Sequence, residues 1–533
     1  MGQSQRRRSW DNLPSEMRWK ILKVLCQDSG IAKYASVCSE WQGFIERITF
    51  QHLILNNSTI KTFDRMISGD KNVHRVHYIQ YIWLRIAISD FGCLQCIKRE
   101  TELEAHSNDL IFTQVVHKLL DILSTWPRRV GSDGVTLEIS VICPSDNEHF
   151  YYDFATHDDY PFKPWDLNIV PHDVDMFHEA HFRKIDRTRL DCPPHWHTWM
   201  GGMENSEYFQ VEERHLGSLI QFRWPNGTQR LPRVEVVNSL VMRHQFKRQL
   251  SPLALATLFS ESLVYATSLR LERWCRPTTE EENDYLTEFR QHSLPSLPKS
   301  LQSFHYVAET FRGGRLVNPV QVNSLSTVQL LANYGHRWKE LSVVAPFGSL
   351  DQFTESHSLK ALDTEPLSPK PWLRLQRVCF KSTVLIPGNE ALISDLLIST
   401  ATIARNMPNL RSIEVFNTKS EWGGSEHPSC LVRYNTEFPQ PILSWQSDWM
   451  IPTVAIYEEI SEQTPGFSFT AQTKRAWGKT ALVHTGHDGL KTVVREPRTF
   501  LSPRVRLADI FKLEAVHPLT RAIMRAYSDR TKL

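Results

Sequence analysis

The stretch "LQSFHY", residues 301–306, has apolar side chains at its first, fourth and sixth positions. Because successive side chains of a β-strand point to opposite faces of the sheet, Phe304 and Tyr306 are expected on one buried face. The same phrase, apolar-x-x-apolar-x-apolar, occurs at five other places in the chain, and each one predicts a short buried strand. The middle positions of the six phrases are Leu240, Leu269, Phe304, Leu341, Val378 and Ile413.

The six middle positions are 29, 35, 37, 37 and 35 residues apart. One strand and one helix in each turn of about 36 residues are typical of a βα solenoid with stacked parallel strands. The array resembles irregular leucine-rich repeats with long turns and without the asparagine ladder of regular repeats. An ordinary α/β layer with irregular crossovers stays open as the alternative. The segments between the phrases that have helical periodicity are 252–266, 280–292, 324–338 and 389–406, with a weaker case at 351–362.

The array is expected to begin upstream of these phrases and to be interrupted once. Residues 78–89 and 135–142 alternate like strands, with a helix predicted at 109–126 between them. Residues 144–232 are rich in turn formers, acids and aromatics and predict a long loop-rich insertion. After Asn417 we expect strands at 429–435 and 441–449, a helix at 453–463, a hairpin at 480–486 and 490–496, and a helix at 518–529.

Composition excludes several classes of protein. A chain of 533 residues is too long for one compact core, and 61 basic against 59 acidic residues give a formal charge of +2, too small a field for nucleic-acid binding. Nine cysteines, an odd number, do not form a disulfide framework. No apolar run is long enough for a signal peptide or a membrane span. We therefore expect an intracellular protein, in the cytoplasm, the nucleus or both.

The N-terminal segment contains two short amphipathic stretches. Pro14 presets the first turn of a helix, and the apolar residues Met17, Ile21, Leu22 and Leu25 follow at helical spacing. A second periodic stretch covers residues 31–50. Because so few large apolar residues make a core that is too small to be self-sufficient, this segment is expected to pack against a partner.

Residues 11–55 resemble an F-box, through Leu13-Pro14, Glu16-Met17, Ile21-Leu22, Leu25, Val37-Cys38 and Trp41, followed by Phe50, Leu53 and Leu55. The resemblance implies a trihelical motif that binds a Skp-family adaptor and, through it, the cullin of an SCF-type ubiquitin ligase. The alternative is an N-terminal helical cap on the following domain. The residues that the resemblance places on the adaptor-facing side, or in support of it, are Leu13, Pro14, Ile21, Leu22, Leu25, Val37 and Trp41.

The chain after residue 55 is similar to a domain of unknown function that follows the F-box in many filamentous-fungal proteins. This similarity rests on "YIWLRIAIS", "MPNLRSIEVFN", "LVRYN" and "LSWQSDW", and it implies an architecture without a substrate. The predicted organisation is a flexible basic tail at 1–10, the F-box at 11–55, an irregular βα solenoid at 56–420 with its insertion at 144–232, and a C-terminal α/β cap and tail at 421–533.

Motifs for catalysis or cofactor binding are weak throughout the sequence. Cys93 and Cys96 have zinc-ligand spacing but lack a second pair of ligands, and the histidines between His178 and His197 do not form a regular ligand set. "WGKT" at 477–480 lacks the preceding glycine of a phosphate-binding loop. The sequence therefore predicts a non-catalytic protein without a metal or other cofactor.

The function that these patterns favour is that of a substrate receptor, in which the F-box binds the adaptor and the βα array binds a target protein. Two alternatives stay open. The first is an interaction scaffold that uses the same F-box without promoting ubiquitination, and the second is an enzyme with an unrecognised site in the insertion.

Overall fold

The structure, a computed structural model, describes part of the chain. The described residues are 10–25, 31–70, 72–92, 95, 98–129, 134–146, 213–225, 227, 229–243, 247–309, 336–344, 372–382, 384, 385, 389, 392, 393, 396, 407–417, 430–435, 442–447, 468–473 and 482–483.

The fold is a mixed α/β fold built on one sheet, in which thirteen strands follow one another in chain order. Strands β1 to β9 are all parallel to their neighbours. This arrangement is compatible with the predicted βα solenoid. These nine strands are β1 (His52–Asn56), β2 (Tyr81–Ala87), β3 (Val135–Ile142), β4 (Val237–Met242), β5 (Ser268–Trp274), β6 (Ser303–Glu309), β7 (Glu340–Val344), β8 (Arg377–Lys381) and β9 (Ser412–Asn417).

The sheet continues past the predicted boundary at residue 420 with a change of direction. Strand β10 (Cys430–Asn435) is antiparallel to β9 and to β11 (Ile442–Ser447). Strand β12 (Ser468–Thr473) is parallel to β11 and antiparallel to β13 (Leu482–Val483). The predicted helices at 351–362, 453–463 and 518–529 and the predicted strand at 490–496 lie outside the described residues, as does the predicted helix at 324–338 except for its last three residues.

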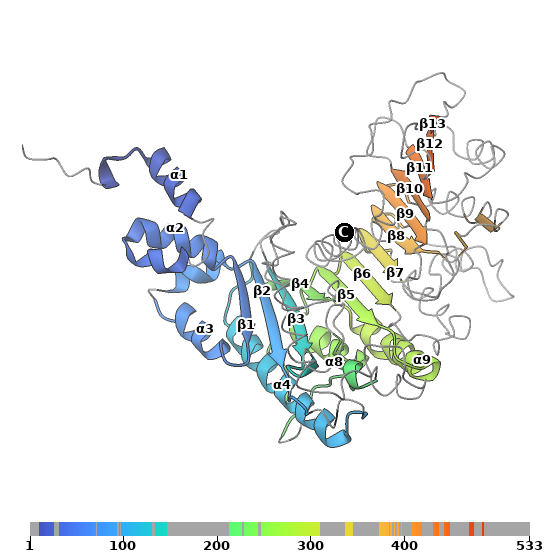
Figure 1. Cartoon of the computed structure of the whole chain (residues 1–533), viewed down its shortest axis with the longest axis horizontal. Helices are drawn as coiled ribbons and strands as arrows, with labels where there is room; N and C mark the ends of the chain where they lie inside the picture. Colours follow the sequence, from blue (N-terminus) through green and yellow to red (C-terminus); the bar gives the residue numbers. More distant parts are fainter. Residues whose placement is uncertain are drawn as a thin grey trace, which may run out of the picture.

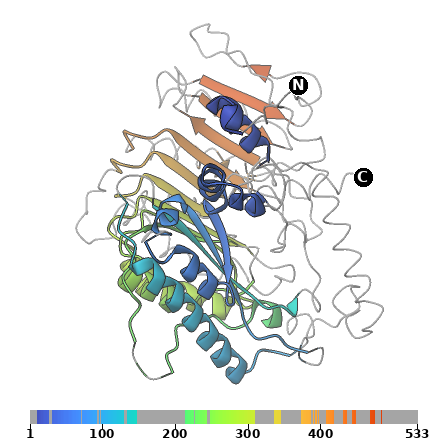
Figure 2. The same ribbon diagram turned by 90° about the vertical axis from the view of Figure 1, so that its left-hand side faces the viewer.

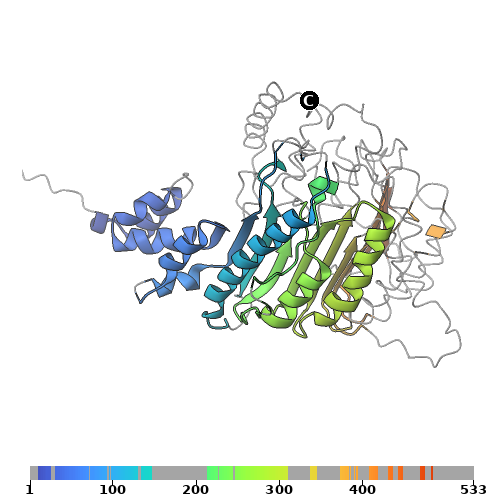
Figure 3. The same cartoon turned by 90° about the horizontal axis from the view of Figure 1, so that it is seen from below.

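The helices pack on one face of the sheet. Figure 1 shows the strands along a curve with helices on its outer side, and Figure 3 shows α4 (Glu102–Ser124), α8 (Pro252–Thr257) and α9 (Thr279–Glu288) in front of the strands. Each of these three follows an N-cap Thr or Ser whose side chain accepts a backbone N–H bond, the usual local signal for a helix start. The covering helices are α3 (Ile60–Ile67), α4 (Glu102–Ser124), α8 (Pro252–Thr257) with a π-helical turn at Leu258–Ser262, and α9 (Thr279–Glu288) with a π-helical turn at Phe289–Ser293 and α10 (Leu294–Ser296).

The repeated phrase forms a single row across the sheet, which confirms the predicted strands. Each middle position pairs in register with the next, so the six side chains lie side by side beneath the helices. The row extends upstream through positions that the phrase did not include. Its members are Leu53, Ile82, Leu137, Leu240, Leu269, Phe304, Leu341, Val378 and Ile413.

A second row, of backbone hydrogen bonds, joins successive turns just before each strand begins. The carbonyl oxygen of Thr267 accepts bonds from the N–H groups of Gln302 and Ser303 at 2.7 and 3.0 Å. The carbonyl of Gln302 does the same for Lys339 and Glu340, at 2.6 and 3.1 Å. Each turn therefore fixes the position of the next, as a stacked array requires.

Four short helices lie at the β1 end of the sheet. Figures 1 and 3 show them projecting from the array, and Figure 2, viewed from that end, shows them in front of the strands. We call them the N-terminal helical unit. The 3₁₀ segment η3 (Val73–Tyr78), between α3 and β2, does not belong to this unit. The members of the unit are the 3₁₀ segment η1 (Trp10–Asn12), α1 (Ser15–Leu25), the 3₁₀ segment η2 (Ile31–Ser36) and α2 (Ser39–Thr49).

Candidate functional site

The N-terminal helical unit is held together by one shared carboxylate and a small aromatic cluster. Glu40 Oε2, on α2, accepts hydrogen bonds from Trp10 Nε1 at 2.8 Å and from Arg18 Nη1 at 2.7 Å. The Trp41 ring lies against Trp10, with ring centroids 5.1 Å apart, and against Tyr34, at 6.4 Å. These contacts bring α1 and α2 together around a core that contains Leu22, Ile31 and Ile45.

Helix α1 has a second apolar face that stays substantially exposed in the described part of the structure. Met17, Ile21 and Val24 follow at intervals of four and three residues, which places them on one side of the helix. Their exposed fractions are 46%, 36% and 64%. We call these three residues the α1 stripe. Exposed apolar side chains grouped in this way are typical of a surface that binds another macromolecule.

The seven predicted adaptor-facing residues fall into three groups. Leu22 is 1% exposed and packs inward, so it supports the helical unit without presenting a surface. Leu13, Leu25 and Trp41 are partly exposed. The exposed members are Pro14, Ile21 and Val37.

The sequence pattern placed Met17, Ile21, Leu22 and Leu25 on one apolar face that packs against a partner. In the structure Leu22 is instead buried within the helical unit, whereas Met17 and Ile21 are exposed. The Arg18–Glu40 ion pair and Leu22 turn the opposite side of α1 toward α2, which leaves Met17 and Ile21 outside. Val24 belongs to the exposed side and was missed. Its spacing of three residues from Ile21 was the signal that could have identified it.

The side of the sheet that faces away from the helices carries polar and charged side chains, which we call the polar face. Tyr81 donates a hydrogen bond to Glu138, and Arg243 pairs with the same carboxylate. Burial raises the pKa of Tyr81, so the phenol stays neutral and remains a donor. The Trp83 ring lies beneath the Arg243 guanidinium, at 4.5 Å, and Trp83 Nε1 donates to Ser140 Oγ at 2.9 Å.

Farther along the polar face, one carboxylate joins three strands. Glu340 Oε2, on β7, accepts a hydrogen bond from Ser303 Oγ of β6 at 2.9 Å and lies 3.4 Å from His305 Nε2 of β6. The other oxygen of the same carboxylate pairs with Arg377 of β8. The hydrogen bond from His305 lowers the pKa of Glu340 to about 2, while burial lowers the pKa of His305. Arg377 keeps 64% of its side chain exposed and offers a cation to solvent.

Ser303, His305 and Glu340 are the residue types of a nucleophilic triad, but their geometry is different. A triad requires the carboxylate on one imidazole nitrogen and the hydroxyl on the other. Here Ser303 Oγ and Glu340 Oε2 both contact His305 Nε2, at 2.9 and 3.4 Å. The imidazole therefore cannot relay a proton between them in this arrangement, and the cluster works as a cross-strand tie.

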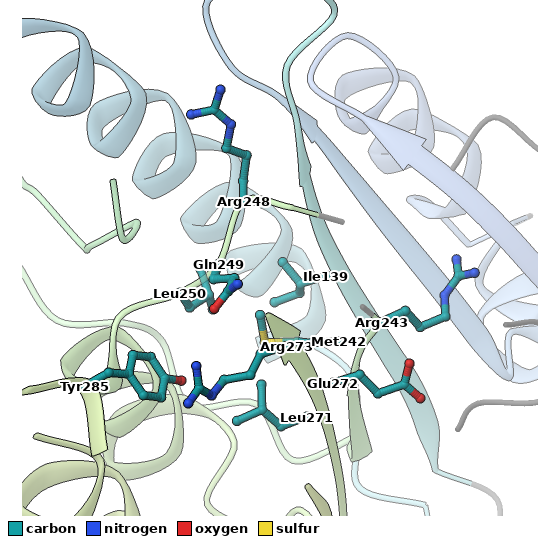
Figure 4. A pocket seen from close by; sticks show the side chains of 10 residues that line it. All are labelled: Ile139, Met242, Arg243, Arg248, Gln249, Leu250, Leu271, Glu272, Arg273 and Tyr285. Carbon is teal, nitrogen blue, oxygen red and sulfur yellow. The ribbon is translucent and has the colours of Figure 1, made fainter. Parts of the chain in front are cut away.

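A cavity of about 10 Å³ lies where the segment 247–250 passes the C-terminal ends of β3 to β5. Figure 4 shows Gln249 and Leu271 near its centre, whereas the charged ends of Arg243 and Glu272 point away. A space of this size holds about one water molecule, and small-molecule sites measure roughly 300 Å³ or more. This cavity is too small to be a ligand site.

The sequence also raised the possibility of metal sites. Within the part of the chain that the structure describes, three or more His, Cys, Asp or Glu residues do not come together in an arrangement that could hold a metal ion. Cys93, Cys96 and the histidines from His178 to His197 lie outside the described residues, as does the "WGKT" stretch. Among the described helices, none has the length and apolar character needed to cross a membrane.

The tryptophans of the array at helix and strand ends are core residues. Trp126 follows the end of α4, Trp274 ends β5, and Trp338 lies two residues before β7, and all three are buried. The Trp338 ring stacks on Phe304 with centroids 4.8 Å apart. Packing within the array accounts for these three buried tryptophans, so they do not indicate a ligand-binding site.

Comparison with protein families finds one relationship, over the later part of the array. Residues 293–499 match a family of unknown function, DUF6546. The match begins before β6 and does not reach the N-terminal helical unit, so the F-box resemblance and the fungal association stay predictions. A comparison with curated proteins gives no match.

Proposed function

We propose that the protein is a substrate receptor of a cullin-based ubiquitin ligase, and that its N-terminal helical unit is an F-box that docks on a Skp-family adaptor. The observation that carries this proposal is the α1 stripe, an apolar surface exposed beside the fully buried Leu22. An amphipathic helix that presents anchors at i, i+4 and i+7 fits a helix-in-groove interface. Pro14 and Val37, also exposed, belong to the F-box pattern and extend the same interface.

In this proposal the remaining chain is an irregular, leucine-rich-repeat-like βα solenoid that binds the target protein. The polar face supports this role at β6 to β8, where Glu340 and Arg377 bring charges of both signs to a partly exposed surface. Such a surface selects a partner by charge complementarity more than by apolar burial. Positioning of a target requires no catalytic residue in the receptor.

The adaptor-binding part is tested by co-expression of the full chain with a Skp-family adaptor, followed by size-exclusion chromatography. We expect a one-to-one complex that is lost in the double variant Ile21→Asp, Val37→Asp. The matched control is Leu253→Asp, Leu373→Asp, which changes two exposed leucines of the array with 50% and 55% exposure. A complex that survives the first double variant, or that is lost equally in the control, would remove the basis of the proposal.

The receptor role is separated from that of a scaffold by the fate of a bound protein. Proteins captured by the full chain are compared in cells that carry the intact chain and the Ile21→Asp, Val37→Asp variant. A receptor predicts that a captured protein becomes more abundant when adaptor binding is lost. Unchanged abundance of every captured protein would favour the scaffold.

A further inference from the structure

A partly buried ion pair lies where the N-terminal helical unit meets the sheet. Glu46, near the end of α2, is 6% exposed. Its carboxylate accepts hydrogen bonds from Arg75 Nε at 3.0 Å, from a second nitrogen of the same guanidinium, and from Gln42 Nε2 at 2.9 Å. His74 Nε2 lies 3.2 Å from Glu46 Oε2, the oxygen that also accepts from Arg75 Nε. Such a carboxylate, held by a two-pronged guanidinium, has a defined orientation.

Arg75 contacts the array as well as α2. Its Nη1 donates to the backbone oxygen of Met66, in α3, at 2.7 Å. The guanidinium also lies over the Phe50 ring, 5.2 Å from the centroid, in the short connection between α2 and β1. One side chain therefore joins α2, α3, η3 and the start of the sheet.

The chain between α2 and β1 has no room for a flexible linker. Helix α2 ends at Thr49 and β1 begins at His52. Gln51 donates its N–H to the Ile48 carbonyl at 3.3 Å, and its own carbonyl accepts from Gln80 and Tyr81 at 2.9 and 3.1 Å. The connecting residue thus belongs to both the helix end and the first rung of the array.

From these contacts we infer that Glu46 and Arg75 are positioning residues that hold the N-terminal helical unit in one orientation on the first strands of the sheet. Partners bound at the α1 stripe and on the array are then kept at a fixed separation. The orientation itself is a property of the isolated chain, whereas its use in presenting a target rests on the proposed function.

The inference is tested on the full chain without any partner, so its outcome is independent of adaptor binding. A keto amino acid is introduced at Ser39, on α2, and at Gln114, an exposed residue of α4, and both are spin-labelled. This chemistry leaves the nine cysteines untouched. Pulsed dipolar spectroscopy then gives the distribution of distances between the two labels.

We expect a single narrow distribution in the parent chain and at least a two-fold broader one in Glu46→Gln, which removes the charge but keeps the shape. Arg75→Lys, which keeps the charge but loses the two-pronged contact, is expected to broaden it less. The matched control, Glu16→Gln at an exposed residue, leaves the distribution unchanged. Circular dichroism confirms that each variant is folded.

Three results would overturn the inference. The first is a broad distribution in the parent chain, and the second is a distribution of unchanged width in both Glu46→Gln and Arg75→Lys. The third is loss of the whole fold in both variants, because the pair would then stabilise the array without setting the orientation of the helical unit.

Discussion

Ile21 and Leu22 are neighbours on α1 whose side chains point about 100° apart around the helix axis, and 36% of Ile21 but only 1% of Leu22 is exposed. The F-box resemblance assigns both residues to the adaptor-facing side or to its support. In the structure Ile21 is part of the exposed surface, whereas Leu22 is part of the buried interior of the helical unit. The proposed adaptor binding and the stability of the helical unit are therefore expected to change independently.

Leu22→Ala is expected to destabilise the N-terminal helical unit by about 2–5 kcal/mol, because it leaves a cavity in a small core. Ile21→Ala is expected to cost less than about 1 kcal/mol, as most surface substitutions do. Chemical denaturation followed by tryptophan fluorescence measures both, since Trp10, Trp19 and Trp41 all lie in this unit. Equal losses in the two variants would contradict the observed orientation of α1.

Gly217→Ala is expected to destabilise the chain strongly. Gly217 has a φ of +63°, and an added Cβ would lie 1.8 Å from Arg248 Nη1. Displacement of Arg248 disrupts its pairs with Glu100 at 3.4 Å and Asp146 at 3.6 Å. The matched control is Gly227→Ala, because Gly227 has a φ of +99° and no atom lies within 4 Å of its added Cβ. This control should lose only the free energy of placing a non-glycine residue at positive φ, about 1–2 kcal/mol. Thermal unfolding should show the larger loss for Gly217; equal losses would mean that Arg248 relaxes without cost.

The buried Arg273–Glu282 pair ties β5 to α9, and each side chain is at most 1% exposed. Glu282→Ala is expected to cost about 3–5 kcal/mol, because it leaves the Arg273 charge buried without its counterion. The double variant Arg273→Met, Glu282→Leu removes both charges and should recover part of this loss. Urea denaturation of the single and double variants tests this expected recovery of stability. A double variant less stable than Glu282→Ala would contradict the electrostatic explanation.

Stability should fall on acidification, in two windows set by the polar face. The pKa of His305 is lowered by burial, so its contribution is complete above its ordinary pKa of about 6.5 and is lost as the pH falls below that value. The pKa of Glu340 is lowered to about 2, so its contribution is complete above about 4.5 and is lost as the pH falls toward 2.

Melting temperatures between pH 8 and pH 3 check both windows. His305→Gln should reduce the dependence between pH 7 and pH 5, and Glu340→Gln the dependence below pH 5. Part of each dependence should remain, because the pKa of His215 is also lowered by burial and the pKa values of Glu46 and Glu104 are also lowered, to about 2. A parent chain whose melting temperature is flat over this range would contradict the assigned ion pairs.

The strands of the array could be predicted because burial on one face imposes an alternating pattern. The row from Leu240 to Ile413 was identified in the sequence, and the register confirms it. Strand β1 was missed because four of its five residues were assigned to the end of the F-box, and β12 was missed because "SFTAQT" is mostly polar. The start of α4 was placed too late, although Thr101 and Glu104 form a capping box that marks it.

The candidate site could be predicted only in part. Helical spacing shows which residues of α1 share a face, but it does not say which face the rest of the chain covers. Pairs such as Glu46 with Arg75 join residues 29 positions apart and have no periodic signal, so they appear only in three dimensions.

The most direct test of the central claim is hydrogen–deuterium exchange of the full chain with and without a Skp-family adaptor. We predict that adaptor slows exchange in peptides covering residues 15–25 and 31–49, and leaves peptides from β2 to β6 unchanged. Protection confined to the strands or to α4, or no change anywhere at saturating adaptor, would show that the α1 stripe is not the docking surface.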